Sequence, residues 1–221
     1  MTGIGLDFGT SNSAAAWFDG KDVHLVNLEL SETVMPTATH LDRELNTLTG
    51  TDAVTQYIDE NRDRIVELTP EIIAKTTLVT TAANPDDPHS QAETETSNVY
   101  GQSWIDRGLR GRLFRGVKRL LGNPTIKRLL VFDHPFRLVA LITPVLLRIR
   151  GSIELELDEP LGDIHLGHPV KFEGHENQLA FDRLEEACGH AGIEHMSFYP
   201  EPVAATLSYL HGEKPAANGR V

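Results

Sequence analysis

The sequence is poor in cysteine, in long apolar runs and in positive charge, and these shortages exclude whole classes of protein. Its single cysteine, Cys188, excludes an internal disulfide and is expected to be a small buried side chain rather than a nucleophile. The apolar run over 138 to 147 contains Pro144 and is too short to span a bilayer. The N-terminus enters a strand pattern at once, without the features of a signal peptide. We therefore expect a cytoplasmic protein.

Lysine and arginine are few overall, but they are concentrated in one segment. The 32 acidic residues outnumber the 20 lysines and arginines, giving 221 residues a formal net charge of -12. This excess opposes attraction to nucleic acid or to anionic lipid, so we expect neither nucleic acid nor a membrane as partner. Between 107 and 128, however, every charged side chain is basic. Most of them should lie on a solvated surface, although a cation that contacts phosphate could be among them.

The N-terminal part is predicted to form a meander of strands. Apolar residues alternate with small or polar ones on both sides of a turn, which is typical of a β-hairpin. The residues of this turn are Gly9, Thr10, Ser11 and Asn12. Asp19 and Gly20 predict a second tight turn, which leads into a third strand within 23 to 28.

The remainder is predicted to alternate helices with strands. We expect a helix beginning near Thr51 or Asp52, a second helix over 99 to 114, and a long one over 136 to 156 that Pro144 kinks or breaks. Residues 84 to 98 are rich in acids and proline and are predicted to form a mobile loop. Strand, helix, strand and helix then follow between 162 and 210, an order that favours a mixed α/β fold.

The first turn has the features of a phosphate-binding loop. It combines backbone N–H groups, small residues, and hydroxyl or amide side chains, so a phosphate could approach closely. Asp7 precedes the turn and could reach the hydrated magnesium ion that accompanies a nucleoside triphosphate. A Walker-type loop is excluded, because no Gly-Lys-Ser/Thr sequence follows. A plain polar hairpin stays open as the alternative.

Two further positions carry candidate catalytic groups. Lys118, in "VKRLLGN", could stabilise the charge of a phosphoryl group during its transfer, although a lone lysine is often only solvated. Glu201 is predicted to lie at the end of a strand, directly before Pro202 in the first turn of a helix. Its carboxylate could orient or deprotonate a water molecule, or could simply cap the helix.

Four segments, taken together and in order, resemble the 70-kDa heat-shock chaperone family (DnaK-like), a member of the actin and sugar-kinase superfamily. They are "GIGLDFGTSNS", "VKRLLG", "GHPVKF" and "YPEPVAATLSYL", and "HPVKFEG" resembles the YegD-like branch. The resemblance implies an actin-like (ribonuclease H-like) ATPase core lobe. This lobe would span 1–39 and 134–221, and a smaller α+β lobe would be inserted over 40–133.

The resemblance also implies a role for each candidate residue. The β- and γ-phosphates of ATP, or the β-phosphate of ADP, would be held by Gly9, Thr10, Ser11 and Asn12. Asp7 would bind Mg²⁺ through water, Lys118 would stabilise the transferring phosphoryl group, and Glu201 would position or activate water. Such a division of labour suits hydrolysis, because phosphoryl transfer requires mainly positioning and charge.

In that family, slow ATP hydrolysis controls a peptide-binding domain, so unfolded polypeptide clients and co-chaperones are implied as partners beside the nucleotide. The sequence contains no Gly-Gly pair and stops before the family's second phosphate loop. We therefore expect the N-terminal half of a longer ATPase domain, which alone binds ATP weakly or not at all. Two alternatives stay open, a non-catalytic interaction module on the same scaffold and a small-molecule (sugar) kinase of the same superfamily.

Overall fold

A computed structural model describes residues 3–66, 68–81, 93–106, 108–158, 161–172 and 176–212. The described chain is a mixed α/β structure with several sheets and four α-helices. It divides into two compact units, the first made of Met1–Glu60 and Gly111–Val221 and the second of Asn61–Arg110. The predicted lobe boundaries near 40 and 133 stay predictions.

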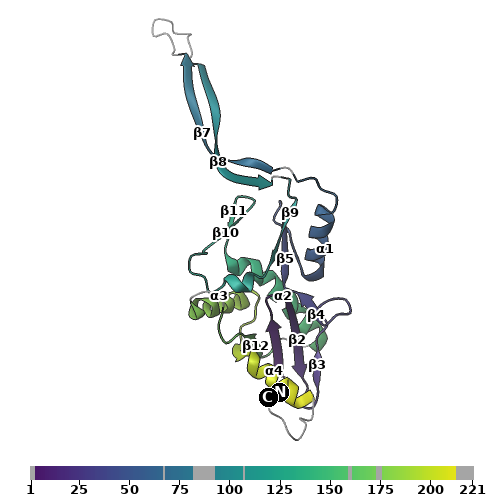
Figure 1. The fold of residues 1–221 in the computed structure, drawn as a ribbon. Coiled ribbons are helices and arrows are strands. Elements are labelled where there is room, and N and C mark those ends of the chain that lie inside the picture. The colour runs from purple at the N-terminus through teal and green to yellow at the C-terminus, as the bar shows by residue number, and fades with distance from the viewer. Residues whose placement is uncertain are drawn as a thin grey trace. The chain divides into compact units, whose positions relative to one another are not determined.

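A mixed sheet lies at the centre of the first unit, with strand order β13-β12-β1-β2-β3 and with β4 paired to β2 (Figure 1). Its strands are β1 (Gly3–Phe8), β2 (Asn12–Phe18), β3 (Val23–Leu25), β4 (Val34–Pro36), β12 (Ile164–His168) and β13 (Met196–Pro200). β1 pairs antiparallel with β2 and parallel with β12, which pairs parallel with β13. The predicted N-terminal hairpin and the two later strands are confirmed.

The sheet buries one face and leaves the other open. Ile4, Leu6 and Phe8 are buried, whereas the intervening Gly5 and Asp7 are exposed, as the period of two in a strand requires. The buried side chains join one core with those of α2 (Leu138–Leu157) and α3 (Asn177–His190). On the open side lies α4 (Glu201–Gly212), whose residues after Glu201 are exposed.

The long helix α2 runs through Pro144 without interruption, so the predicted break there is wrong, and the alternative kink stays a prediction. Ile142, Val145 and Leu146, on both sides of the proline, are buried in the core. Their packing offsets the backbone hydrogen bond that proline cannot make, because most helix stability in a protein comes from tertiary burial. No helix of the described ranges is both long and apolar enough to cross a membrane.

A second, three-stranded sheet in the same unit has the order β6-β5-β9. The remaining elements of the unit are β5 (Ala38–Asp42), β6 (Thr47–Thr49), α1 (Gly50–Asn61), β9 (Gly111–Arg115), the 3₁₀ helix η1 (Val117–Leu120), β10 (Leu129–Val131) and β11 (His134–Phe136). Arg148 links α2 to β6 and α1, because its guanidinium donates to the Thr49 carbonyl and pairs with Asp52. The same guanidinium also pairs with Glu29. The helix predicted near Thr51 is confirmed as α1.

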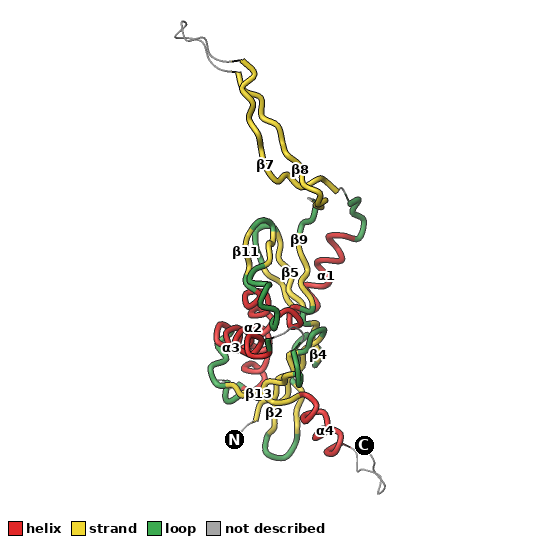
Figure 2. Tube along the Cα trace, turned by 60° about the vertical axis from the view of Figure 1, so that its left-hand side comes forward, coloured by secondary structure: helices red, strands yellow, loops and turns green. Residues whose placement is uncertain are grey.

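The second unit is a two-stranded antiparallel ribbon of β7 (Leu68–Thr81) and β8 (Glu93–Asp106), which Figure 2 shows as neighbouring yellow strands. The helix predicted over 99 to 114 is wrong, because this stretch belongs to β8 and β9. Pairing with β7 decides the outcome, and a partner that lies outside the stretch itself is invisible to local spacing. Of the loop predicted over 84 to 98, residues 93–98 belong to β8, and the rest lies outside the described residues.

Candidate functional site

The turn between β1 and β2 is tight and fixed by its surroundings. A Cβ at Gly9 would lie 2.2 Å from the backbone oxygen of Asn12, so the turn has room only for glycine at this position. The backbone N–H of Thr37 donates to the Ser11 carbonyl at 2.9 Å, and the Ser13 and Thr37 hydroxyls share a hydrogen bond of 2.7 Å. The turn is therefore held by Thr37, directly after β4, as well as by the pairing of β1 with β2.

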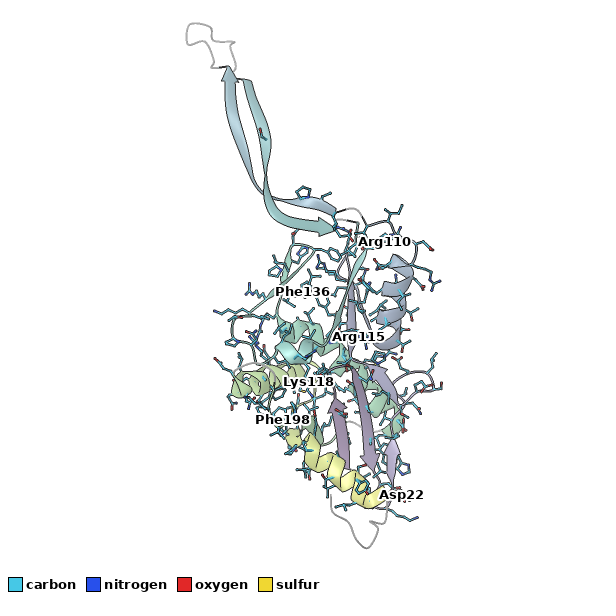
Figure 3. All side chains as sticks on the ribbon, viewed as in Figure 1. Asp22, Arg110, Arg115, Lys118, Phe136 and Phe198 are labelled. Carbon is cyan, nitrogen blue, oxygen red and sulfur yellow. The ribbon has the colours of Figure 1, made fainter. Side chains whose placement is uncertain are left out.

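Lys118, which is labelled in Figure 3, belongs to the 3₁₀ helix η1 and lines the same cavity as Gly9 and Thr10 of this turn. Gly116, which precedes η1, adopts a left-handed conformation with φ 69° and lies beside the turn, since a Cβ there would be 3.8 Å from Cγ2 of Thr10. Lys118 is buried, with 5% of its side chain exposed. A buried ammonium requires a negative partner, because desolvation of an unpaired charge is costly.

Glu201 supplies that partner from the first residue of α4. Its Oε1 lies 2.8 Å from Nζ of Lys118, although the two residues are 83 positions apart in the sequence. The carboxylate comes close to the sheet because β12 has a glycine there. A Cβ at Gly167 would lie 3.3 Å from Cγ of Glu201 and 3.9 Å from Cα of Asp7. The glycine thus lets Glu201 lie over the ends of β1 and β12.

Asp7 belongs to the same electrostatic cluster. Partial desolvation raises the pKa of its carboxyl above the usual 3.8, the negative charge of Glu201 raises it further, and Lys118 opposes both effects. Two carboxylates therefore surround one lysine. Such a group can bind a hydrated cation through its oxygens and an anionic phosphate through its ammonium.

A cavity of about 150 Å³ lies in front of these groups. Its lining residues are Gly9, Thr10, Lys118, Arg119, Pro169, Lys171, Phe172 and Glu201. A second cavity of about 600 Å³ lies between α4 and the open face of the sheet, and both Asp7 and Glu201 line it. Glu201 therefore stands at the boundary of the two cavities.

The structure brings together most, not all, of the predicted site residues. Gly9, Thr10, Lys118 and Glu201 line the smaller cavity, and Asp7 interacts electrostatically with the last two. Ser11 and Asn12 are exposed and do not line that cavity, and Asn12 is already the first residue of β2, opposite Pro36.

Two further cations, Arg119 and Lys171, line the smaller cavity, and both are exposed. Arg119 belongs to the basic residues of 107–128, among which a cation that contacts phosphate is expected, whereas Lys171 is not predicted. The signal that could have found Lys171 is its place just after β12, a strand that runs parallel to β1.

No protein-family model matches the sequence. Within the described ranges, no group of three or more His, Cys, Asp or Glu side chains is placed to hold a metal ion. What the protein does must therefore be inferred from the cluster of Asp7, Lys118 and Glu201 beside the turn.

Proposed function

We propose that the chain is the N-terminal part of the ATP-binding and ATP-hydrolysing domain of a heat-shock-protein-70-like chaperone, built on an actin-like core. One observation carries the proposal. The buried Lys118 ammonium and the Glu201 carboxylate meet at 2.8 Å beside the Gly9–Thr10 turn, and they arrive there from separate segments of the chain. Phosphate binding requires such a convergence of small residues, a cation and a carboxylate.

The residues present fit the phosphate groups of a nucleotide and its magnesium ion. The smaller cavity, about 150 Å³, offers room for phosphate groups rather than for a whole nucleotide. Gly9 and Thr10 would contact the phosphates, with Lys118 as the cation. Asp7 would hold Mg²⁺ through its water ligands, because magnesium prefers carboxylate oxygens and retains most of its waters.

Bound ATP would supply a γ-phosphoryl group that can be transferred to water. Lys118 stabilises negative charge on the phosphoryl oxygens, and its burial strengthens this interaction. The ion pair uses Oε1 of Glu201, while the other carboxylate oxygen can accept a hydrogen bond from the attacking water and orient it. Asp7 would contribute a second carboxylate, which could hold a hydrated Mg²⁺.

In the protein that this proposal describes, the nucleotide state would control the binding of unfolded polypeptide clients, with co-chaperones as further partners. It would act in the cytoplasm, where ATP and magnesium are available. The cavity of about 150 Å³ represents only part of a nucleotide site, which is consistent with the expected weak binding of ATP by this chain alone.

The experiment that tests the proposal measures phosphate release from ATP by the full reading frame that contains this chain, with and without added sugars. We expect slow hydrolysis that sugars do not stimulate and that Lys118→Met and Glu201→Ala both abolish. Sugar-dependent consumption of ATP would instead support the small-molecule kinase. Hydrolysis that survives both substitutions would contradict the proposed roles.

A second candidate function, a non-catalytic interaction module, is favoured by the apolar surface beside α4. Val203, Leu207 and Leu210 share one face of α4 by their helical spacing, and each is about half exposed. Exposed apolar groups that share one helix face are typical of a binding surface. This candidate predicts that neither the chain nor its full reading frame binds nucleotide.

A further inference from the structure

The Lys118–Glu201 pair does not by itself supply the positive charge that a phosphate needs in the smaller cavity. Asp7 and Glu201 carry two carboxylates, and Lys118 carries the one ammonium that faces both of them. With all three groups ionised, the cluster carries a net negative charge, which opposes the approach of a phosphate. A phosphate that enters this cavity needs further positive charge on its wall, and Arg119 and Lys171 both line it. Arg119 already takes part in another interaction.

Lys171 lies in the right place to supply that charge. It is exposed, it lines the same cavity as Gly9, Thr10 and Lys118, and it belongs to the loop that follows β12. Among the described residues it forms no ion pair, whereas Lys118 is already engaged by Glu201. Its ammonium is therefore available to a ligand.

The backbone around Lys171 is anchored on both sides. Phe172 is buried, its N–H donates to Oδ1 of Asn177 at 3.0 Å, and its ring packs edge-on against Phe181 with centroids 5.1 Å apart. Before Lys171, the His168 ring bonds the Pro169 carbonyl at 2.8 Å. The neighbours of Lys171 on both sides thus hold its backbone, so that the entropic cost of using the lysine falls mainly on its own side chain.

We propose that Lys171 is a phosphate-binding residue of this cavity, where it contacts the polyphosphate end of the nucleotide across from Lys118. The inference rests on the proposed function and adds a cation that the resemblance does not assign. A lysine is suited to this position, because its flexible stem delivers a compact point charge to a phosphate oxygen from an exposed loop.

The test uses calorimetric titration of Mg-ATP, inorganic tripolyphosphate and adenosine into the full reading frame that contains this chain. Lys171→Met should weaken Mg-ATP and tripolyphosphate about tenfold, as expected for loss of one charge-assisted contact, and should leave adenosine within about twofold. Lys171→Arg should retain most of the affinity, because the charge stays. The affinity of the Lys171→Met variant for tripolyphosphate should also depend less steeply on salt.

Lys127→Met is the matched control, because Lys127 is an exposed lysine that lines a different surface depression. It removes the same net charge and should change every affinity by less than about twofold. An equal loss in the Lys127 variant, or an equal loss of adenosine binding in the Lys171 variant, would overturn the assignment.

The two proposals fail in different ways. If the wild-type protein binds none of the three probes, the proposed function and the role of Lys171 both fall. If the wild type binds Mg-ATP and Lys118→Met abolishes binding while Lys171→Met does not weaken it, the proposed function stands and only the role of Lys171 is overturned.

Discussion

Lys118 and Glu201 form an ion pair of 2.8 Å in which the two partners differ in burial, with 5% of the lysine side chain and 38% of the glutamate side chain exposed. The consequences of breaking the pair should therefore depend on which partner is removed. A buried charge left without its partner costs more than a charge that can return to water.

Glu201→Ala should destabilise the protein more than Lys118→Met. The first change leaves a buried ammonium unpaired and should cost about 1–3 kcal/mol, whereas the second leaves a partly exposed carboxylate and should cost less than about 1 kcal/mol. Urea denaturation measures both free energies of unfolding. The double variant should be less destabilised than the sum of the two, and strict additivity would show that the pair is not coupled.

Gly9→Ala should open the turn between β1 and β2. The new Cβ would stand 2.2 Å from the Asn12 carbonyl oxygen, so the backbone must shift, at a cost of about 1–3 kcal/mol. Gly3→Ala, at the start of β1, is the control, because nothing lies within 4 Å of its added Cβ. Thermal unfolding of the two variants should differ clearly. Equal midpoints would mean that the turn accommodates a side chain.

Asp7→Asn should stabilise the folded chain at neutral pH. Because desolvation and Glu201 raise the pKa of Asp7 above 3.8, the folded protein binds more protons than the unfolded chain between 3.8 and the raised value. Stability contributed by Asp7 is therefore lost as pH rises through that window. The gain on substitution should be below about 1 kcal/mol, since the side chain is exposed to solvent. It should vanish at pH values below 3.8, and a gain that persists there would contradict this cause.

Cys188 should be inert in the folded protein. It is buried in α3, and desolvation raises the pKa of its thiol to about 12, so almost no thiolate is present at neutral pH. A coloured disulfide reagent should react on the order of a thousandfold more slowly with the native protein than with the chain in guanidinium. Rapid native labelling would contradict the burial of this side chain.

Ile149→Ala should remove a large part of the stability of the core. Its side chain on α2 is fully buried, and such truncations cost about 2–5 kcal/mol. Leu155→Ala on the same helix is the matched control, because that leucine is 84% exposed and should cost less than about 0.5 kcal/mol. Chemical denaturation of both variants gives the comparison, and similar losses would show that α2 does not pack as described.

Local patterns predicted the elements whose signals are local. The alternation of apolar with small or polar residues predicted β1 and β2, and Pro202 in the first turn of a helix predicted α4. By contrast, β7 and β8 depend on each other across a long separation, and β9 pairs with β5 from a distant part of the chain. Spacing within 99 to 114 could not reveal those partners, so the helix predicted there was wrong.

The candidate site was predictable to the extent that residue type signals chemistry. Gly9, Lys118 and Glu201 were singled out because a small residue, a cation and a carboxylate each have a distinct role in phosphate chemistry. Lys171 was not, because an exposed lysine has no local signature and becomes significant only when the loop after β12 places it at the cavity. The ion pair of Lys118 with Glu201 likewise required the fold.

The central claim is most directly tested by calorimetric titration of Mg-ATP, with Mg-ADP as comparison, into this chain and into the full reading frame that contains it. We predict measurable binding by the full reading frame, weak or no binding by this chain alone, and loss of binding in Asp7→Ala and Lys118→Ala. Absence of binding in both wild-type forms would contradict the account and favour the interaction module.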